Sequence, residues 1–581
     1  MLKFFPFIFF VFFVAVADEP VAFASEPVPV HTAPAAAQFA PAAAGTTDRI
    51  IISQIYITPG DVFDDAATHS PYEKKLYEFG NYFHIETRES IIRARLPFEI
   101  GDTVSIAEIQ EAEKNLRSLT YLSDAKIEII SAAQNTENNA ENETALYITT
   151  SDNWTFSPAF NLGKPGEEWL WSIGLIENNL LGFGHTVGFF FEHQEDRDQK
   201  YLLYQSGDFI FPHHSFNFLW SENSDGYSRS IGLAYPFISR AKNGWAYNTN
   251  LLWSKRKENF YESKNPTPIY TTENLKEDSL EFNLRRSFGG THFKTYLGAS
   301  YNFHKIWGGE VSPSLQPHIA GDNIGSPLHA FSATPSSFVS PNLQDSRLGI
   351  SFAISRIHLQ KRYNLHKVKW AEDLERGYYL ETKISKNFEQ LNAGNRDFYF
   401  EHAINLSLGT PKHNFYLKGK NSFYYNDTIN NMSNNLFGEY IYKPNLKLSS
   451  VLNFQIDSWQ KTDYLHLLYL DANNAFPGFP SHYLAGENTF IFKVEQRYFP
   501  NFEILTQIPS FAIFATAGEA TDRLRAFEPR NLQYEAGLGL RVSSSKSVQS
   551  KVVHLDISFP LNGELRNGFK PRFSFIGKVG L

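Results

Sequence analysis

The sequence predicts a mainly β protein, in which a large antiparallel transmembrane β-barrel follows one small α+β domain. Three observations favour this fold class. Strand-length stretches in which apolar and polar residues alternate recur along the last three-quarters of the chain. Aromatic residues make up 15% of the 581 residues, yet the mean hydropathy is only -0.33. Beyond the first two dozen residues, no apolar run reaches the roughly 18 residues that a transmembrane helix needs.

The first 24 residues have the pattern of a secretory signal peptide. Lys3 precedes an apolar run over residues 4–17, and small residues follow, so cleavage is expected after Ala17 or Ala24. The alternative is an uncleaved anchor helix, for which this run is short. Residues 25–47 are rich in Ala and Pro and lack a core pattern, which favours a flexible linker. Cysteine is absent, so an exported chain would contain no disulfide.

Residues 48–150 predict the small α+β domain. The β-branched run RIIISQIYIT predicts a first strand, and RESIIRA predicts a short helix. Ser105 and Glu108 have capping-box spacing at the start of a second helix. Two further strands are expected at 126–130 and 144–150. The order β-α-α-β-β is typical of an α+β fold, and the insert 69–89 leaves the position of the first helix open.

Residues 151–581 predict the barrel. In the strand 489–498, Phe490, Phe492 and Val494 alternate with Lys493, Glu495 and Arg497. A basic side chain facing lipid at the bilayer midplane costs roughly 2–4 kcal/mol, so the charged set is expected to face a wet interior. The alternative is a soluble β-sandwich or propeller, whose strands also alternate. Other alternating stretches lie at residues 186–193, 230–237, 245–253, 534–542 and 552–560.

The stretch RLPFEIGDTVSIAEIQEAEKNLRSLTYLSDAKIEI resembles a POTRA domain. This resemblance implies a periplasmic module that captures unfolded client segments, either by pairing with an edge strand or along a groove between a helix and a strand. Carried onto this chain, the client-binding strand contains Ile127 and Ile129. One such module is expected, over residues 48–150.

Three barrel segments resemble the BamA/TamA superfamily, also called the bacterial surface antigen family. They read DNWTFSPAFNLG, WSIGLIENNLLGFGHTVGFFFEH and AEDLERGYYLETKIS. The resemblance implies about 16 strands in the bacterial outer membrane and an extracellular loop that folds back inside the barrel. Strand candidates before this loop exceed the family's eleven, and we expect the excess to be strand extensions into loops. Five strands are expected after the loop, at 489–498, 510–518, 533–543, 552–560 and 572–581.

The inward loop of the family carries an aliphatic residue followed by Arg-Gly-aromatic. The matching residues are Phe476, Pro477, Gly478 and Phe479, so Pro477 replaces the family's arginine. Of the two acidic positions that this arginine reaches in the family, one is kept as Glu495 and the other is Thr516. We expect the loop to stay inside, held by the packing of its two phenylalanines and by Pro477, with Arg497 as the replacement partner of Glu495. The alternative is an ordinary surface hairpin at 476–485.

The resemblance implies a protein that assists the insertion or translocation of polypeptides at the outer membrane. Its partners would be membrane lipid and unfolded or exported polypeptides, with periplasmic chaperones or accessory proteins as further candidates. The barrel would admit clients at a weak seam between the strands 154–163 and 572–581. The seam residues are Phe156, Phe160, Phe573 and Phe575. Two alternatives are a passive pore or surface structural barrel with a POTRA tether, and a secretion pore for one dedicated partner protein.

The sequence favours no enzyme and no cofactor or metal site. It contains no H-E-x-x-H motif, no G-x-S-x-G motif and no cysteine, and His213-His214 is more typical of a turn than of a ligand pair. The net charge of -9 and the lack of a basic cluster argue against a nucleic-acid partner. Residues 308–343 predict a long extracellular loop. The chain ends at Leu581, where barrels of this type usually end in Phe.

Overall fold

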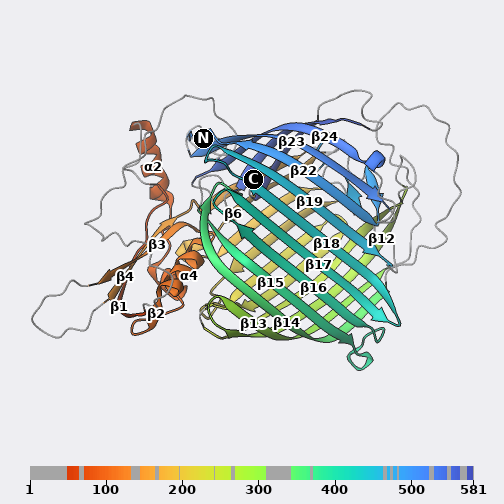
Figure 1. The fold of residues 1–581 in the computed structure, drawn as a ribbon, viewed down its shortest axis with the longest axis horizontal. Helices are drawn as coiled ribbons and strands as arrows, with labels where there is room; N and C mark the ends of the chain where they lie inside the picture. The colour runs from red at the N-terminus through yellow and green to blue at the C-terminus, as the bar shows by residue number, and fades with distance from the viewer. Residues whose placement is uncertain are drawn as a thin grey trace, which may run out of the picture.

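The computed structural model describes two units, an N-terminal α+β domain and a closed β-barrel (Figure 1). The described residues are 49–63, 71–131, 144–163, 169–194, 197–240, 242–262, 269–308, 342–366, 371–461, 468–470, 476–479, 483–500, 502–504, 506–521, 529–545, 551–562 and 572–579. The expected signal peptide, the linker, Leu581 and residues 309–341 of the expected long loop lie outside them.

The N-terminal domain is a four-stranded sheet with two of its three described helices, α3 and α4, packed against it. The sheet order is β2-β1-β4-β3, with β1 parallel to β4 and the other pairs antiparallel. Its strands are β1 (Arg49–Thr58), β2 (Thr103–Ser105), β3 (Leu122–Ser131) and β4 (Thr144–Asp152), and its helices are α2 (Pro71–Phe83), α3 (Glu89–Ala94) and α4 (Ile106–Arg117). Among the described residues, no helix has the length and apolar character needed to cross a membrane.

Helix α4 begins at the predicted capping box. The hydroxyl of Ser105 accepts the backbone N–H of Glu108, and the carboxylate of Glu108 accepts the backbone N–H of Ser105, so two otherwise unpaired donors are satisfied. Ile109, Ala112 and Leu116 lie on one face of the helix and are buried against the sheet. The predicted second helix and the two strands after it are therefore confirmed, and α2 lies within the insert that sequence alone left open.

Twenty strands among the described residues form one closed barrel in chain order. The short strands β20 (Leu468–Leu470) and β21 (Leu484–Gly486) form a separate two-stranded sheet. The barrel strands are β5 (Phe156–Gly163), β6 (Leu170–Glu177), β7 (Thr186–His193), β8 (Asp198–Ser206), β9 (Ser215–Asn223), β10 (Gly226–Tyr235), β11 (Trp245–Glu262), β12 (Ile269–Gly289), β13 (Phe293–Gly308), β14 (Asn342–Tyr363), β15 (Ala371–Asn387), β16 (Phe398–Gly409), β17 (His413–Asn426), β18 (Thr428–Tyr442), β19 (Leu448–Gln460), β22 (Asn488–Tyr498), β23 (Gln507–Thr521), β24 (Gln533–Ser544), β25 (Lys551–Pro560) and β26 (Arg572–Val579).

The barrel fold class is confirmed, but the barrel has more strands than the 16 that the resemblance implied. Five strands follow the loop, as predicted, so all the additional strands precede it. The candidates expected to be loop extensions are strands in their own right. β18 illustrates the difficulty, because it begins TINNMSNN and lacks apolar alternation over its first half.

Side-chain exposure alternates along the barrel strands. On β14, Leu348, Ile350 and Phe352 are 48%, 67% and 51% exposed, whereas Ala353 is 2% exposed. On β22, Val494 is 44% exposed, while Glu495 and Arg497 are 3% and 4% exposed. The apolar exterior and the charged interior predicted for this strand are therefore present.

The N-terminal domain lies beside one end of the barrel, which we call the near rim (Figure 1). The near rim contains the turns β6–β7, β8–β9, β10–β11 and β14–β15, and helix α4 contacts two of these regions directly. We call the opposite end the far rim. The segment between β19 and β22, which contains the predicted inward loop, starts and ends at the far rim.

Candidate functional site

The segment 476–479 lies inside the barrel. Phe476 and Phe479 are both 0% exposed, and their ring centroids are 5.5 Å apart at 74°. They pack in one cluster with Leu470 of β20 and Ile491 of β22. Gly518 of β23 gives the loop its room, because a Cβ at this position would lie 2.8 Å from the ring of Phe476. The two phenylalanines thus occupy the buried positions expected of the inward loop, and Pro477 between them is half-buried.

A hydrogen bond between a backbone N–H of the loop and a glutamate of the barrel wall anchors the loop. The N–H of Gly478 donates to Oε2 of Glu535 at 2.8 Å, and Glu535 is 0% exposed. A Cβ on Gly478 would lie 2.7 Å from the same oxygen, so only glycine permits this approach. Sequence reasoning missed Glu535 as an anchor. The sequence did contain a signal for this role. Glu535 shares the inward face of β24 with Gly537 and Gly539, which have no side chains and leave space beside Glu535.

The predicted inner-wall residues lie together on β22 and β23. Oε1 of Glu495 accepts Nε of Arg497 at 2.7 Å, and Oε2 of Glu495 lies 2.9 Å from Nζ of Lys493. Thr516 is 2% exposed and pairs in register with Lys493 on one side and Glu535 on the other. Arg497 is therefore the partner of Glu495, as expected, while Thr516 is a small neighbour of the glutamate that binds the loop.

Arg497 also reaches a near-rim turn that enters the barrel. Its Nη1 donates to the carbonyl of Leu365, which is 2% exposed and packs with Ile441 and Val451. The turn belongs to the connection between β14 and β15. One wall of the barrel is thus in contact with the loop from the far rim and with this turn from the near rim.

His366 follows Leu365 in this turn and lies between two carboxylates. Its Nε2 is 2.6 Å from Glu439, and its Nδ1 is 3.3 Å from Glu372. The backbone N–H groups of Leu365 and His366 also donate to Glu372. Burial acts to lower the pKa of His366, but the hydrogen bonds and charges of the two glutamates outweigh it and raise the pKa to about 9. The turn is therefore fixed by charge-assisted hydrogen bonds.

The first contact between the two units is at the turn β6–β7, the E-N-N-L-L-G-F-G segment. The carbonyl of Gly182 accepts the N–H of Arg88 at 3.1 Å, and the guanidinium of Arg88 lies 3.8 Å from the ring centroid of Phe183. Nδ2 of Asn179 donates to the hydroxyl of Thr87 at 2.9 Å. Gly182 has a φ of +76°, and a Cβ there would lie 2.5 Å from the carbonyl oxygen of Glu86. This turn is a docking point for the N-terminal domain.

The second contact is made by helix α4. The carboxylate of Glu111 accepts the backbone N–H of Arg240 at 2.8 and 2.9 Å, and Arg117 binds Asp373 of β15 through two hydrogen bonds. Lys114 binds Glu375 at 2.7 Å. Burial would lower the pKa of Arg117, but the hydrogen bonds with Asp373 and Glu113 outweigh it and raise that pKa. The E-D-L-E-R-G segment thus supplies acidic partners for basic residues of α4.

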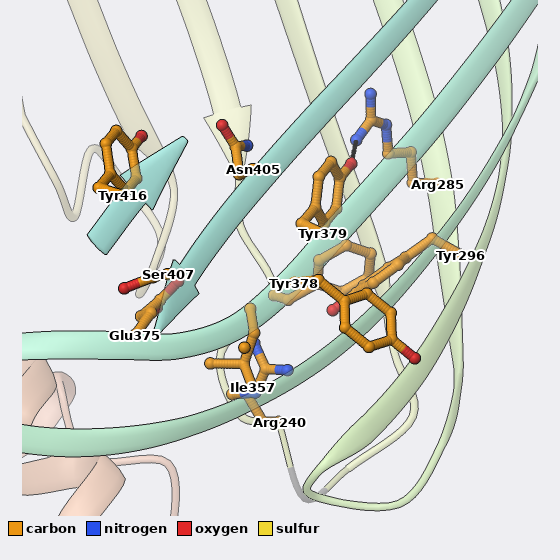
Figure 2. A pocket seen from close by; sticks show the side chains of 12 residues that line it. Arg240, Arg285, Tyr296, Ile357, Glu375, Tyr378, Tyr379, Asn405, Ser407 and Tyr416 are labelled. Carbon is orange, nitrogen blue, oxygen red and sulfur yellow. Dashed lines mark hydrogen bonds between the residues drawn. The ribbon is translucent and has the colours of Figure 1, made fainter. Parts of the chain in front are cut away.

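A cavity of about 440 Å³ opens in the lumen behind this second contact (Figure 2). Arg285 on its wall donates to the hydroxyl of Tyr379 at 3.1 Å and pairs with Glu381, and the labelled tyrosines Tyr296 and Tyr378 lie beside them (Figure 2). Aromatic rings, guanidinium groups and amides together suit a polar or extended segment better than a purely apolar ligand. Its lining is Phe237, Arg240, Arg285, Tyr296, Ile357, Glu375, Gly377, Tyr378, Tyr379, Asn405, Ser407 and Tyr416. The described residues contain no group of three or more acidic or histidine side chains placed to hold a metal.

The expected seam strands are neighbours in the closed barrel. β26 lies next to β5, and Phe156 and Phe160 of β5 are 43% and 42% exposed. Phe573 and Phe575 lie on β26 opposite Ile557 and Leu555 of β25, and their side chains are outside what the structure describes. β5 also contains Pro158, which has no N–H to give to a neighbouring strand.

The side chains of the two residues expected to bind a client, Ile127 and Ile129, face the core of the domain. Ile127 is 8% exposed and belongs to the core, and Ile129 packs against that core. The side chains of Lys126, Glu128 and Ile130 alternate with them and point away from the helices. A probe for a bound client therefore belongs on these residues rather than on the two isoleucines of the prediction.

The comparisons with known proteins found similar folds but no related sequence. No family model matches the chain, and no curated protein matches it. Solved structures with a similar fold include BamA from Haemophilus ducreyi lacking POTRA domains 1–3, with 12% identity, a TM-score of 0.39, and coverage of 91% of this chain and 84% of that one. CdiB from Acinetobacter baumannii has 12% identity, a TM-score of 0.41, and coverage of 91% and 74%. CdiB from Escherichia coli has 10% identity, a TM-score of 0.44, and coverage of 91% and 76%. Similarities this low carry no argument about function, which has to come from the geometry of this chain.

Proposed function

We propose that this chain is an outer-membrane protein of the BamA/TamA type that assists the insertion or translocation of polypeptides. The observation that carries the proposal is the loop 476–479, which lies buried inside a closed barrel whose near rim holds a small α+β domain. The exposed apolar side chains of strands such as β14 supply the lipid-facing surface, and the charged wall of β22 faces inward. The role is non-catalytic, and its partners are lipid and extended polypeptides.

In this proposal the N-terminal domain acts as a periplasmic POTRA module. β3 is an edge strand of its sheet, and edge strands pair with extended segments through backbone hydrogen bonds. The near rim then faces the periplasm and the far rim faces the outside of the cell. A captured segment is passed to the seam between β5 and β26, where Pro158 leaves β5 without one ladder donor.

Two segments that enter the lumen argue against the alternative of a passive pore. The loop from the far rim and the Leu365 turn from the near rim both occupy space inside the barrel and meet the same wall. A conducting pore needs a continuous aqueous path, which these two insertions narrow. A secretion pore for one dedicated partner would use the same parts and differ only in its client.

The test uses purified protein in lipid vesicles, with a denatured eight-stranded barrel protein as the client. We expect the folding rate of the client to rise in vesicles that contain the chain, and steady ion conductance to stay low. A disulfide between Phe160→Cys and a cysteine scanned along β26 should abolish the gain, because the parent chain contains no other cysteine. Conductance without any gain in folding would instead support the passive pore.

A further inference from the structure

The free edge of β3 is covered in part by two side chains of helix α4. β3 is the last strand of its sheet, so in the described part of the chain no strand pairs with its outer edge. The N–H of Ile127 donates to Oε2 of Glu113 at 3.2 Å, and the carbonyl of Ala125 accepts Nη1 of Arg117 at 3.1 Å. The N–H of Ala125 is taken by Oδ1 of Asp124 at 2.9 Å. Three backbone groups that an added strand would use are therefore already bonded.

The same guanidinium group holds the barrel. Nε and Nη2 of Arg117 donate to the two carboxylate oxygens of Asp373 at 3.0 and 2.7 Å, while Nη1 binds Glu113 and the carbonyl of Ala125. Arg117 is 7% exposed and Asp373 is 15% exposed, so water competes little for these bonds. Because the guanidinium is planar and rigid, one side of its fork cannot move without disturbing the other.

We propose that docking of the N-terminal domain on β15 and masking of the β3 edge are one coupled event, with Arg117 as the coupling residue. The inference rests on the proposed function, which makes β3 the client edge. An extended polypeptide pairs with β3 only after Glu113 and Arg117 leave its backbone groups, and this weakens the hold of Arg117 on Asp373. Conversely, release from Asp373 frees the edge. The partner is any extended strand, since the masked groups belong to the backbone.

A second ion pair of the same interface provides a matched control. Lys114 binds Glu375, two residues beyond Asp373 on the same strand. In the described residues, the ammonium group of Lys114 binds no backbone group of β3. Glu375 and Asp373 both belong to β15 of the barrel. Replacing either by its amide should therefore leave the folding of the N-terminal domain unchanged. Loosening the interface at Glu375 should therefore leave the β3 edge masked, whereas loosening it at Asp373 should expose that edge.

The first measurement is hydrogen exchange of the full chain in lipid nanodiscs, comparing Asp373→Asn with Glu375→Gln. The amide of Arg88, which donates to Gly182, reports docking, and the amide of Ile127 reports masking. In Asp373→Asn we expect roughly tenfold faster exchange at Ile127, because a charge-assisted pair is replaced by a neutral contact. In Glu375→Gln we expect no change at Ile127. Equal exchange at Ile127 in both variants would overturn the coupling.

The second measurement asks whether the exposed edge takes up a strand. Glu128→Cys places the only cysteine of the chain beside the β3 edge on the face away from the helices, and a ten-residue extended peptide with a reactive disulfide is the probe. We expect faster cross-linking in the Asp373→Asn background than in the Glu375→Gln background. Cross-linking that occurs at the same rate in both backgrounds overturns the coupling and leaves client capture standing. Faster exchange at Ile127 without any cross-linking supports the coupling and contradicts client capture by this edge.

Discussion

Replacing Gly478 by alanine should release the inward loop from the wall. The new Cβ would lie 2.7 Å from Oε2 of Glu535, and it would lie 3.3 and 3.4 Å from atoms of Ser558 and Pro560. The carboxylate therefore has to retreat, and Ser558 and Pro560 limit movement of the loop in the other direction. Overpacking of this kind costs about 1–3 kcal/mol. Retreat of the carboxyl group also leaves the buried N–H of Gly478 without its acceptor, which costs about 1–3 kcal/mol.

Taken together, these two terms amount to about 4 kcal/mol, or close to a 10³-fold change in the population of released loop at 1.4 kcal/mol per factor of ten. Hydrogen exchange of residues 476–479 in lipid vesicles measures that population, and we expect protection to fall by up to this factor. Gly290→Ala is the control, since a Cβ at Gly290 meets nothing within 4 Å. Unchanged protection of the loop in Gly478→Ala would refute the assignment of Glu535 as its anchor.

Three further predictions concern the exterior, the near rim and pH. Ile350→Arg should destabilise the barrel in lipid by about 2–4 kcal/mol in urea unfolding, and Asn405→Arg, which faces the luminal cavity, by less than about 1 kcal/mol. Gly182→Ala should cost about 1–2 kcal/mol for the φ of +76° alone, seen as faster exchange of the Arg88 amide; full protection there would contradict the docking role of this turn. The pKa of His366 is raised to about 9 in the folded chain, so its stabilisation is complete below pH 6.5 and is lost as pH rises through 9. The protection factor of the Leu365 amide, which is corrected for base-catalysed intrinsic exchange, should therefore fall between pH 7 and 10, and in His366→Gln it should not change with pH over this range.

The sequence was sufficient to predict the barrel, the orientation of β22 and the buried loop, because each has a local signal. Alternation of Val494 with Glu495 and Arg497 allows one orientation at low cost, and the capping box at Ser105 marks the start of α4. The strand count had no comparable signal. Residues that face the lumen are free to be polar, and near a rim both faces of a strand can be polar. The first half of β18 is an example.

The contacts between units were beyond sequence reasoning for a different reason. Asp373 and Gly182 are separated from their partners, Arg117 and Arg88, by long stretches of chain, and neither motif contains a feature that names a partner. From the sequence, the segments containing them are expected only to belong to the barrel. They do belong to it, but Gly182 and Asp373 lie at the near rim and contact the N-terminal domain. Only the tertiary structure supplies that information.

An uncharged residue at position 477 suits the way charge is balanced on the wall. An arginine at this position would add a cation to a surface that already pairs Arg497 with Glu495 and Arg541 with Asp556. Proline adds no charge and has no N–H of its own to satisfy, so the next amide, that of Gly478, is left to bind Glu535.

The same wall also explains why the loop and the near-rim turn are not independent. Arg497 binds Glu495 beside the loop and the carbonyl of Leu365 in the turn, so its guanidinium group joins the two insertions. Moving the loop outward would remove packing from Ile491 and expose the charged pairs beside it to water, which weakens their mutual attraction. The hold of Arg497 on the turn would then weaken as well. Opening of the lumen at one rim should therefore loosen the other, and Arg497→Lys, which keeps the charge but loses the planar fork, should uncouple the exchange rates of the loop and of the turn.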